Sequence, residues 1–481
     1  MTEKQTIFIR FTDDYCQYTH KQKENRSIER YHALPLYCAC ERNTIQQFQD
    51  AIVSEYSIPM MTSKEKLEAF LEESRKRVSY KVPTAQQLWC EMMKRICDKA
   101  IEEAHKHGFD GNEIVISLPE YLDESLREMI LTAAECSGKM LGIEMKVTSN
   151  SLMAANYFPF YSYLATASNT PNKFPGFHIN CFIESFFNET QWSIVLSKDS
   201  NAIVLKTGKV DIGNYSFFRE CFKKLLVEQK EIGEFHSLTR QEKNCLIEMI
   251  KHWIHLVNLP ACTTINVDNV EADKVIITRE DYIKEVEVYT KEIIEKIMET
   301  VNEVNGYLAT VDKIQLGNEI IELDEDHQKV KEFVVDSMNI NGLLFENLKD
   351  QSGMELVKTN CFYQNVIEGA FAVKQTVIYK MIEPHKFEVA TVEFGNHEGK
   401  YDVKDITEVI NNTESVQKNY KRLLVVKSKI QKETYELKDF KDHKKEIFDA
   451  IKEIGNKTID ADEFQKLWDA YKEEYAKKYG Q

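Results

Sequence analysis

Few side chains in this sequence have the types and spacing that metal or catalytic chemistry needs. His252 and His255 lie three residues apart in a helical stretch, so both imidazoles would share one helix face and could bind a metal ion. The sequence places no third histidine or carboxylate beside them, and we interpret the pair as structural. Nucleophile elbows, phosphate-binding P-loops and zinc-site spacings do not occur in the sequence. Spacing alone therefore predicts no catalytic residue and no metal site.

A second pattern, in residues 455–464, is similar to a calcium-binding EF-hand loop. Lys452 stands where the first acidic ligand belongs, and Lys457 stands where the loop needs glycine. A helix–turn–helix capped by Thr458 or Asp460 explains the stretch better, because both side chains can accept a hydrogen bond from the first turn of a helix.

Charge and composition limit the classes of function. The net charge of −16 argues against broad nucleic-acid binding, which needs a basic face. The eleven cysteines are scattered, with Cys38 and Cys40 as their one close pair, which is typical of reduced thiols in a cytosolic protein. The first ten residues are polar, and no run of about 18 apolar residues occurs. We expect a cytoplasmic protein that makes no broad direct contact with nucleic acid, although a local basic patch is compatible with this charge, and that does not bind a membrane.

Strands and helices alternate along most of the chain, which predicts an α/β fold. Its length of 481 residues indicates two to four structural units. Apolar runs of strand length predict strands at 6–11, 32–39, 114–118, 181–187, 192–196, 202–206 and 312–316. Helical spacing predicts helices at 64–77, 83–108, 124–135, 280–305, 328–338 and 366–379.

Residues 82–158 resemble one region of the ATPase domain of the 70-kDa heat-shock chaperones. The family's strand A-V-I-T-V-P-A-Y-F has its counterpart in I-V-I-S-L-P-E-Y-L at 114–122. A helix follows, then L-G-I at 141–143, then N-S-L-M-A-A at 150–155 in place of N-E-P-T-A-A. The resemblance needs no gap in this region, and it implies a two-lobed, actin-like (ribonuclease H-like) ATPase fold.

Three further segments resemble the family in the same order along the chain. T-G-K-V-D-I-G-N at 207–214, which includes Gly213, is similar to A-G-D-T-H-L-G-G. Residues 245–282 are similar to a helix, strand pair and I-T-R segment, and residues 365–370 to E-A-V-A-Y-G. The resemblance therefore covers roughly residues 6–380.

The phosphate loops that the resemblance implies have lost most of their glycines. The first loop, I-D-L-G-T-T in the family, reads I-R-F-T-D-D, so Arg10 replaces an acidic residue and Thr12 replaces the glycine. Asp13 and Asp14 follow, and they would repel a triphosphate unless a metal ion bridged them.

The second loop, F-D-L-G-G-G-T, reads I-E-S-F-F-N-E. Glu184 keeps an acidic residue, whereas Phe186 and Phe187 replace glycines that let the backbone approach phosphate closely. The adenosine loop keeps one glycine, Gly317.

The family's catalytic glutamate and switch proline correspond to Ser151 and Leu152. These losses predict a pseudo-ATPase with no catalytic residue and no expected cofactor. A remodelled cleft that still binds ATP or ADP with magnesium is the alternative.

The resemblance also predicts the domain organisation. Residues 1–158 would form lobe I, 159–345 lobe II, 346–383 a return segment completing lobe I, and 384–481 a helical extension similar to a reduced lid. This extension is too short for the family's substrate-binding β-domain plus lid. We therefore expect a chaperone-like scaffold or co-chaperone that binds a client, a co-chaperone or a host complex. The alternative is an active ATP-dependent chaperone or an actin-like assembly protein.

One helix face in this extension carries Phe464, Leu467, Trp468 and Tyr471, at spacings of three and four residues. Such a face must be buried, and we predict that it packs either on the chain itself or on a partner.

Overall fold

The computed structural model describes the chain in separate stretches. These are residues 6–20, 32–41, 44–47, 51, 54, 56–78, 82–150, 178–198, 201–213, 215–216, 219, 233–240, 242–244, 246, 263–265, 275–277, 279–316, 319–323, 328–330, 332–336, 355–359, 377–383, 386–390, 418–419, 422–458 and 460–479. Ser151, Leu152, His252, His255 and Gly317 lie outside the described residues.

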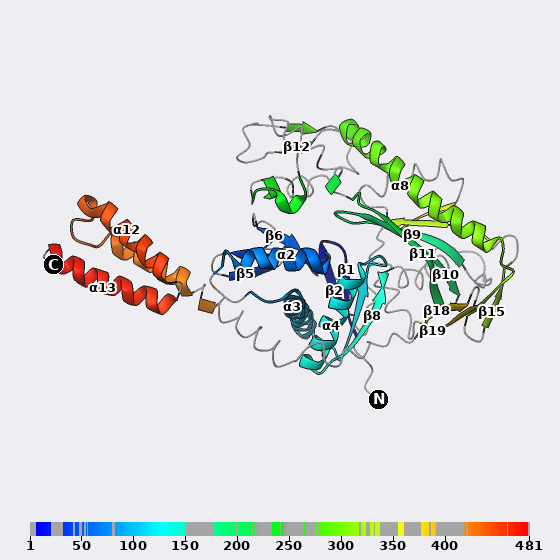
Figure 1. The fold of residues 1–481 in the computed structure, drawn as a ribbon, viewed down its shortest axis with the longest axis horizontal. Coiled ribbons are helices and arrows are strands. Elements are labelled where there is room, and N and C mark those ends of the chain that lie inside the picture. Colours follow the sequence, from blue (N-terminus) through cyan, green and yellow to red (C-terminus); the bar gives the residue numbers. More distant parts are fainter. Residues whose placement is uncertain are drawn as a thin grey trace.

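The first sheet has the order β3-β2-β1-β7-β8. Its central strand β1 (Thr6–Phe11) runs antiparallel to β2 (Tyr15–His20), which runs antiparallel to β3 (His32–Pro35). On the other side, β7 (Glu113–Leu118) and β8 (Glu144–Ser149) run parallel to β1. The strands predicted at 6–11 and 114–118 are confirmed, and Figure 1 shows this sheet beside its helices.

Two long helices pack on this sheet through their apolar faces. Capping residues define where each helix begins and ends. Helix α3 (Ala85–Lys106) begins with a capping box, in which Thr84 and Gln87 exchange side-chain hydrogen bonds with each other's backbone. Helix α4 (Glu124–Leu141) ends at Gly142, whose φ of 67° is left-handed and favours glycine. The apolar faces of both helices share one buried core with the strands, as predicted from their spacing.

A small second sheet, of order β5-β4-β6, adjoins the first. It contains β4 (Tyr37–Glu41), β5 (Thr44–Gln47) and β6 (Ser57–Pro59). The single strand predicted at 32–39 is therefore divided between two sheets, and the break falls at Leu36. Helix α2 (Lys64–Arg75) follows and buries Leu67 and Leu71 in the core of the first sheet.

A nine-stranded sheet forms the second half of the fold. Its strands β9 (His178–Ser185), β10 (Thr190–Lys198) and β11 (Asn201–Val210) make antiparallel pairs. Strand β16 (Glu332–Asp336) runs parallel to β9, and β17 (Glu355–Thr359) runs parallel to β16. These pairings confirm the three strands predicted between residues 181 and 206.

The two sheets repeat one strand arrangement. The strands β3-β2-β1-β7-β8 and β11-β10-β9-β16-β17 have the same order when numbered along the chain, and they have the same directions. In each, a central strand is flanked by an antiparallel pair on one side and by two parallel strands on the other. The sequence has no fixed-period repeat, so this duplication is visible only in the strand pairing.

Four further strands extend the second sheet beyond β11: β14 (Lys313–Leu316), β15 (Glu319–Glu322), β18 (Val377–Glu383) and β19 (Lys386–Ala390). Helix α8 (Arg279–Leu308) lies against this sheet (Figure 1). Its buried apolar side chains belong to the core of the sheet. Two short strands, β12 (Thr263–Ile265) and β13 (Val275–Ile277), and the 3-10 turn η1 (Phe235–Ser237) complete the described elements of this half.

Two helix predictions are wrong within the described residues. Residues 332–336 form β16 and not part of a helix, because Phe333 and Val334 are buried between two parallel neighbours. Residues 377–379, predicted as a helix end, belong to β18, and residues 366–376 lie outside the described part.

The segment 346–383 also differs from its predicted role. Its two described strands, β17 and β18, pair with β16 and β11 of the second sheet and not with the first sheet. Strand β19 lies beyond residue 384 and pairs with both β14 and β18, so the expected boundary at 384 cuts through a strand hairpin.

The C-terminal helices form a unit with its own core. A helical segment at 422–434, α12 (Phe440–Lys457) and α13 (Ala461–Tyr479) lie side by side (Figure 1). Together they bury Leu423, Ile430, Ile447, Ile454, Phe464, Trp468 and Tyr475. Leu467 and Tyr471 are partly buried against the same cluster. The predicted apolar face of α13 is therefore covered by the neighbouring helices of the tail.

The turn before α13 follows the predicted capping. Asp460 Oδ1 accepts a hydrogen bond from the Glu463 N–H at 2.8 Å, and Thr458 is the residue at which α12 ends. The helix–turn–helix interpretation of residues 455–464 is therefore confirmed.

Candidate functional site: two hairpin turns that meet

The turn between β1 and β2 contains Thr12, Asp13 and Asp14. The Thr12 N–H donates to the Tyr15 carbonyl at 2.9 Å, which closes the hairpin. The Thr12 hydroxyl also accepts from the Tyr15 N–H at 3.1 Å and lies 3.2 Å from Asp14 Oδ1. The Thr12 side chain thus stabilises the turn by hydrogen bonds within it. At this position the resemblance implies a glycine, which would leave space for a phosphate.

The matching turn of the second sheet lies between β9 and β10. Here the Phe186 N–H donates to the Glu189 carbonyl at 2.8 Å. Phe186 is buried, and Phe187 is half-buried.

Gly213 packs directly against the backbone of this turn. A Cβ on Gly213 would lie 2.5 Å from the Glu189 nitrogen and 2.7 Å from the Phe186 carbonyl oxygen, so glycine is required there. The structure therefore brings Gly213 to the loop that contains Phe186 and Phe187.

Asp13 joins the two turns. Its Oδ1 accepts from the Phe187 N–H at 3.0 Å, and its Oδ2 accepts from the Asn188 N–H at 2.6 Å. Successive backbone N–H groups directed at one point form an anion-binding arrangement, which commonly holds phosphate. In this chain a buried carboxylate from the first hairpin already occupies that arrangement.

Burial sets the protonation of the two aspartates in the first turn. It raises the pKa of Asp13 well above its ordinary value, and the neighbouring Asp14 raises that pKa further. The hydrogen bond from the Asn188 N–H acts in the opposite direction, because it favours the ionised form of Asp13. Burial likewise raises the pKa of Asp14 to about 6. Two acidic groups this close do not ionise independently.

A buried ion pair connects the same two strands. Arg10 and Glu184 form a salt bridge, and the Arg10 side chain is 5% exposed. Asn150 Nδ2 donates to the Phe11 carbonyl at 3.1 Å and lies 3.5 Å from Glu184 Oε2, while Ser117 donates to Asn150 Oδ1 at 2.6 Å. The negative charge of Glu184 is thus balanced by a guanidinium from the first sheet.

Arg10 and Asn150 were not predicted as site residues. Arg10 could have been found from the sequence, because it is the one charged side chain in the strand T-I-F-I-R-F and is surrounded by apolar residues. Asn150 carries no comparable signal, since an asparagine at a strand end is common in turns.

Aromatic rings contact one another across the region next to these turns. Phe187 lies 5.0 Å from Phe235 and 5.6 Å from Tyr215, and Tyr37 from the first half lies 6.0 Å from Phe235 (distances between ring centroids). Fully buried Lys243 donates to the Ser54 carbonyl and to the Ser57 hydroxyl, each at 2.6 Å. These contacts join the two halves at a second place, and sequence reasoning did not predict them.

The predicted site residues are therefore largely brought together. Thr12, Asp13, Asp14, Glu184, Phe186, Phe187 and Gly213 lie in or against the two turns, and Gly317 lies outside the described residues. Within the stretches that the structure describes, no group of three or more histidine, cysteine, aspartate or glutamate side chains is placed to hold a metal ion.

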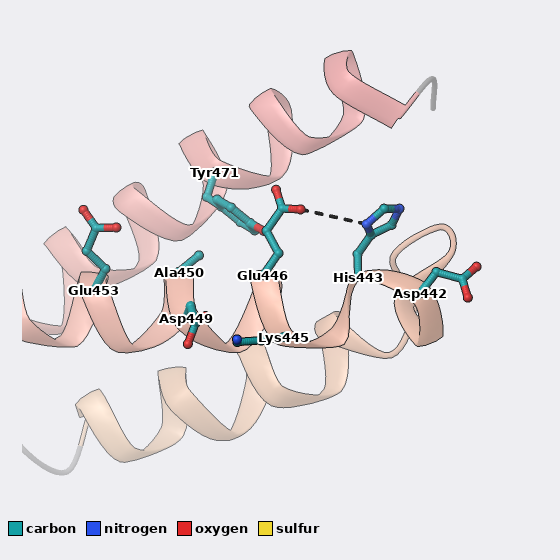
Figure 2. Close-up of a pocket in the computed structure, with 8 residues that line it drawn as sticks. All are labelled: Asp442, His443, Lys445, Glu446, Asp449, Ala450, Glu453 and Tyr471. Carbon is teal, nitrogen blue, oxygen red and sulfur yellow. Dashed lines mark ion pairs between the residues drawn. The ribbon is translucent and has the colours of Figure 1, made fainter.

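A cavity of about 610 Å³ lies in the tail, not between the turns. Figure 2 shows its carboxylates on α12 and Tyr471 on α13. Glu446 in this cavity accepts from Lys478 at 2.9 Å and from the Tyr479 hydroxyl at 2.8 Å, and Glu453 pairs with Lys457 at 2.8 Å. Two of the four carboxylates that line the cavity are therefore partnered within the chain, and Asp442, Asp449 and Lys445 complete its charged lining.

Comparison with known proteins adds no relative: the chain matches no protein-family model and no curated protein sequence. Among the helices that the structure describes, none is long and apolar enough to cross a membrane.

Proposed function

We propose that this protein has a two-lobed, actin-like fold related to the 70-kDa heat-shock chaperones and acts as a non-catalytic scaffold or co-chaperone for other proteins. The repeated arrangement of five strands supports the two-lobed fold, because a duplicated sheet of this order and direction is what the resemblance implies. The central hairpin turns of the two sheets contact each other, as phosphate loops of such a fold would.

The observation that carries the proposal is the Asp13 carboxylate on the Phe187 and Asn188 amides. A nucleotide phosphate bound to the second turn would have to displace the Asp13 side chain from these two amides, and it would lie beside the negative charge that the two aspartates share. The Phe186 and Phe187 side chains also occupy space that glycines would leave open. The chain's own side chains thus occupy the place where the resemblance puts the phosphates.

The Arg10–Glu184 pair supports the same conclusion. Magnesium binding to Glu184 would require the guanidinium to move, which would leave a buried cation unpaired. ATP hydrolysis by this cleft is therefore not expected.

We also propose a reducing, cytoplasmic environment for the protein. The seven described cysteines are buried free thiols. Burial raises the pKa of Cys97 to about 12, so this thiol stays protonated and unreactive.

Calorimetry with MgATP and MgADP tests the closed cleft, with an active 70-kDa heat-shock chaperone as positive control. We expect no binding in the micromolar range. A dissociation constant near 1 μM, about −8 kcal/mol, would overturn the proposal and favour an ATP-driven chaperone or an assembly protein. Asp13→Gly is the informative variant, because it frees two amides, and phosphate binding gained only in this variant would support the anion-like role of Asp13.

The scaffold role needs a separate test. Affinity purification of the full chain from its own cells, with chemical crosslinking, should recover a protein partner in near-equal amount. A chain that is always recovered alone and hydrolyses ATP would contradict the scaffold role.

A further inference from the structure

The C-terminal helical unit has an apolar groove on the side of α12 opposite to the acidic cavity. The groove is lined by Ile430 from the helical segment 422–434, by Phe448, Ile451 and Gly455 from α12, and by Phe464 from α13. Its volume of about 370 Å³ falls within the range of ligand pockets, roughly 300–1,000 Å³. We call it the tail groove.

The floor of the tail groove remains partly open to solvent. Phe448 is 38% exposed, although phenylalanine in a small helical unit normally belongs to the core. Leu424 is 49% exposed and lies three residues before Lys427, so it extends the apolar surface by one turn along the first helix. The groove thus offers a place for at least one apolar side chain from outside.

Lysines surround this floor. Lys427 Nζ lies 5.5 Å from the centroid of the Phe464 ring, Lys444 Nζ lies 6.0 Å from that of Phe448, and Lys452 lines the groove directly. Within the part of the tail that the structure describes, none of these three lysines makes an ion pair. Lys457, Lys472 and Lys478 of the same unit do pair with glutamates.

The charge pattern identifies the kind of occupant. In a chain of net charge −16, three lysines without carboxylate partners surround an apolar floor. Carboxylates from another molecule would complement these cations, and an aromatic or leucine side chain would fill the floor.

We propose that the tail groove binds an acidic peptide segment of a partner protein, with apolar anchors against Phe448 and Ile451 and carboxylates at Lys427, Lys444 and Lys452. This inference goes beyond the proposed scaffold role, because it names the surface and the chemical class of the partner. Its readout is peptide binding and not nucleotide binding, so either idea can fail without the other.

Fluorescence anisotropy of the full-length protein tests the proposal. The probe is a short labelled peptide with leucine and phenylalanine on one helix face and glutamates elsewhere. We expect a dissociation constant of about 1–100 μM that weakens with added salt, since exposed charges are screened. A peptide with lysines in place of the glutamates, and one with alanines in place of both anchors, should bind at least about tenfold more weakly.

Two variants locate the binding. Lys427→Glu combined with Lys452→Glu should weaken peptide binding at least about fivefold, whereas Lys466→Glu with Lys477→Glu makes the same charge change on exposed α13 positions and should not.

Gly455→Met fills the groove without changing charge. A Cβ there meets Phe464 at 3.6 Å, an ordinary contact, so the fold should tolerate it, and replacing a helical glycine should raise the thermal midpoint. Peptide binding should be lost in Gly455→Met and kept in Gly306→Met, a helical glycine with open space around it.

Three results would overturn the proposal. The first is equal binding of the lysine peptide and the glutamate peptide. The second is unchanged binding in folded Gly455→Met. The third is self-association of the chain, seen by sedimentation, that the Lys427→Glu and Lys452→Glu changes abolish, because the groove would then hold a second copy of the chain.

Discussion

At the scale of single residues, Asp13 joins the two hairpin turns through a buried side chain. Burial disfavours the ionised form of this side chain. Its carboxylate binds two amides of the opposite turn, which compensates part of the loss of hydration. Asp14 beside it is half-buried, and hydrogen bonds with Asp13 and Thr12 lower its pKa against the effect of burial. The two aspartates therefore respond differently to substitution.

Replacing Asp14 by asparagine should stabilise the protein at neutral pH. The pKa of folded Asp14 is raised from 3.8 to about 6, so the folded state binds more protons than the unfolded state between these values. Its contribution to stability is fully present below about pH 4 and is lost as the pH rises through 6. We expect Asp14→Asn to gain about 1–3 kcal/mol over the original chain near pH 7 and little near pH 4.

Urea unfolding at several pH values measures this difference. Asp312→Asn, which neutralises an exposed carboxylate, is the control and should change stability by less than about 0.5 kcal/mol. A gain from Asp14→Asn that does not depend on pH would contradict the burial argument.

Gly213 and Gly306 form a matched pair for a second residue-scale prediction. A Cβ on Gly213 would clash with three backbone atoms of the second turn, so Gly213→Ala should cost about 2 kcal/mol or more. Gly306 lies in α8 with nothing within 4 Å of such a Cβ, so Gly306→Ala should stabilise by about 0.5–1 kcal/mol. Thermal unfolding of both variants measures these changes in stability. Equal changes for Gly213→Ala and Gly306→Ala would mean that the backbone of the second turn can shift to accommodate a Cβ.

At the scale of elements, the capping residues next to a helix decide where it begins. The partner strands on either side decide whether a segment such as 332–336 forms a strand. Helices α3, α4 and α13 begin at Thr84, Asp123 and Asp460, whose side chains accept hydrogen bonds from the first turn. Strand β16 has no comparable local signal. Its residues 332–336 became a strand because β9 and β17 supply backbone partners on both sides.

The cap of α13 gives a prediction at this scale. Asp460→Ala removes the acceptor for the Glu463 N–H and should destabilise the C-terminal helical unit by about 1 kcal/mol. Lys466→Ala, an exposed change in the same helix, should have almost no effect. Hydrogen–deuterium exchange of residues 440–479, measured at increasing temperature, follows this unit separately from the rest of the chain. No change in its midpoint for Asp460→Ala would show that the cap does not contribute.

At the scale of the whole molecule, the second sheet and the tail meet at a different boundary from the predicted one. Strand β19 ends at Ala390 and completes the pairing between β14 and β18. The helical unit has its first described residues at 418 and a core of its own. A cut at 384 thus removes part of the sheet, whereas a cut at 417 removes only the helical unit and keeps β19.

Two truncations test this boundary. A chain ending at residue 417 should stay folded and monodisperse, because it keeps every described strand of the second sheet. A chain ending at residue 384 loses β19 and should unfold at a lower temperature, with the sheet edge exposed to aggregation. Calorimetry and light scattering compare the two. If both truncated chains behave alike, β19 does not stabilise the sheet.

The sequence by itself determined the elements whose signal is local. Strands β1 and β7, helices α3 and α4 and the turn before α13 follow from apolar runs, helical spacing and capping residues, which act within a few positions of the chain. The sequence also shows that neither hairpin turn contains glycine, and this limits the backbone conformations of both turns because glycine's freedom is a property of a single residue.

Only the tertiary structure decided what those turns do. Asp13 and Asn188 are 175 positions apart, and no periodicity in the sequence links them. The same holds for Lys243 and Ser54, and for β16 between its two neighbours. Buried carboxylates, buried ammonium groups and the backbone groups at strand edges need hydrogen-bonding partners to offset the free-energy cost of leaving water. Those partners come from whichever segments the fold brings close.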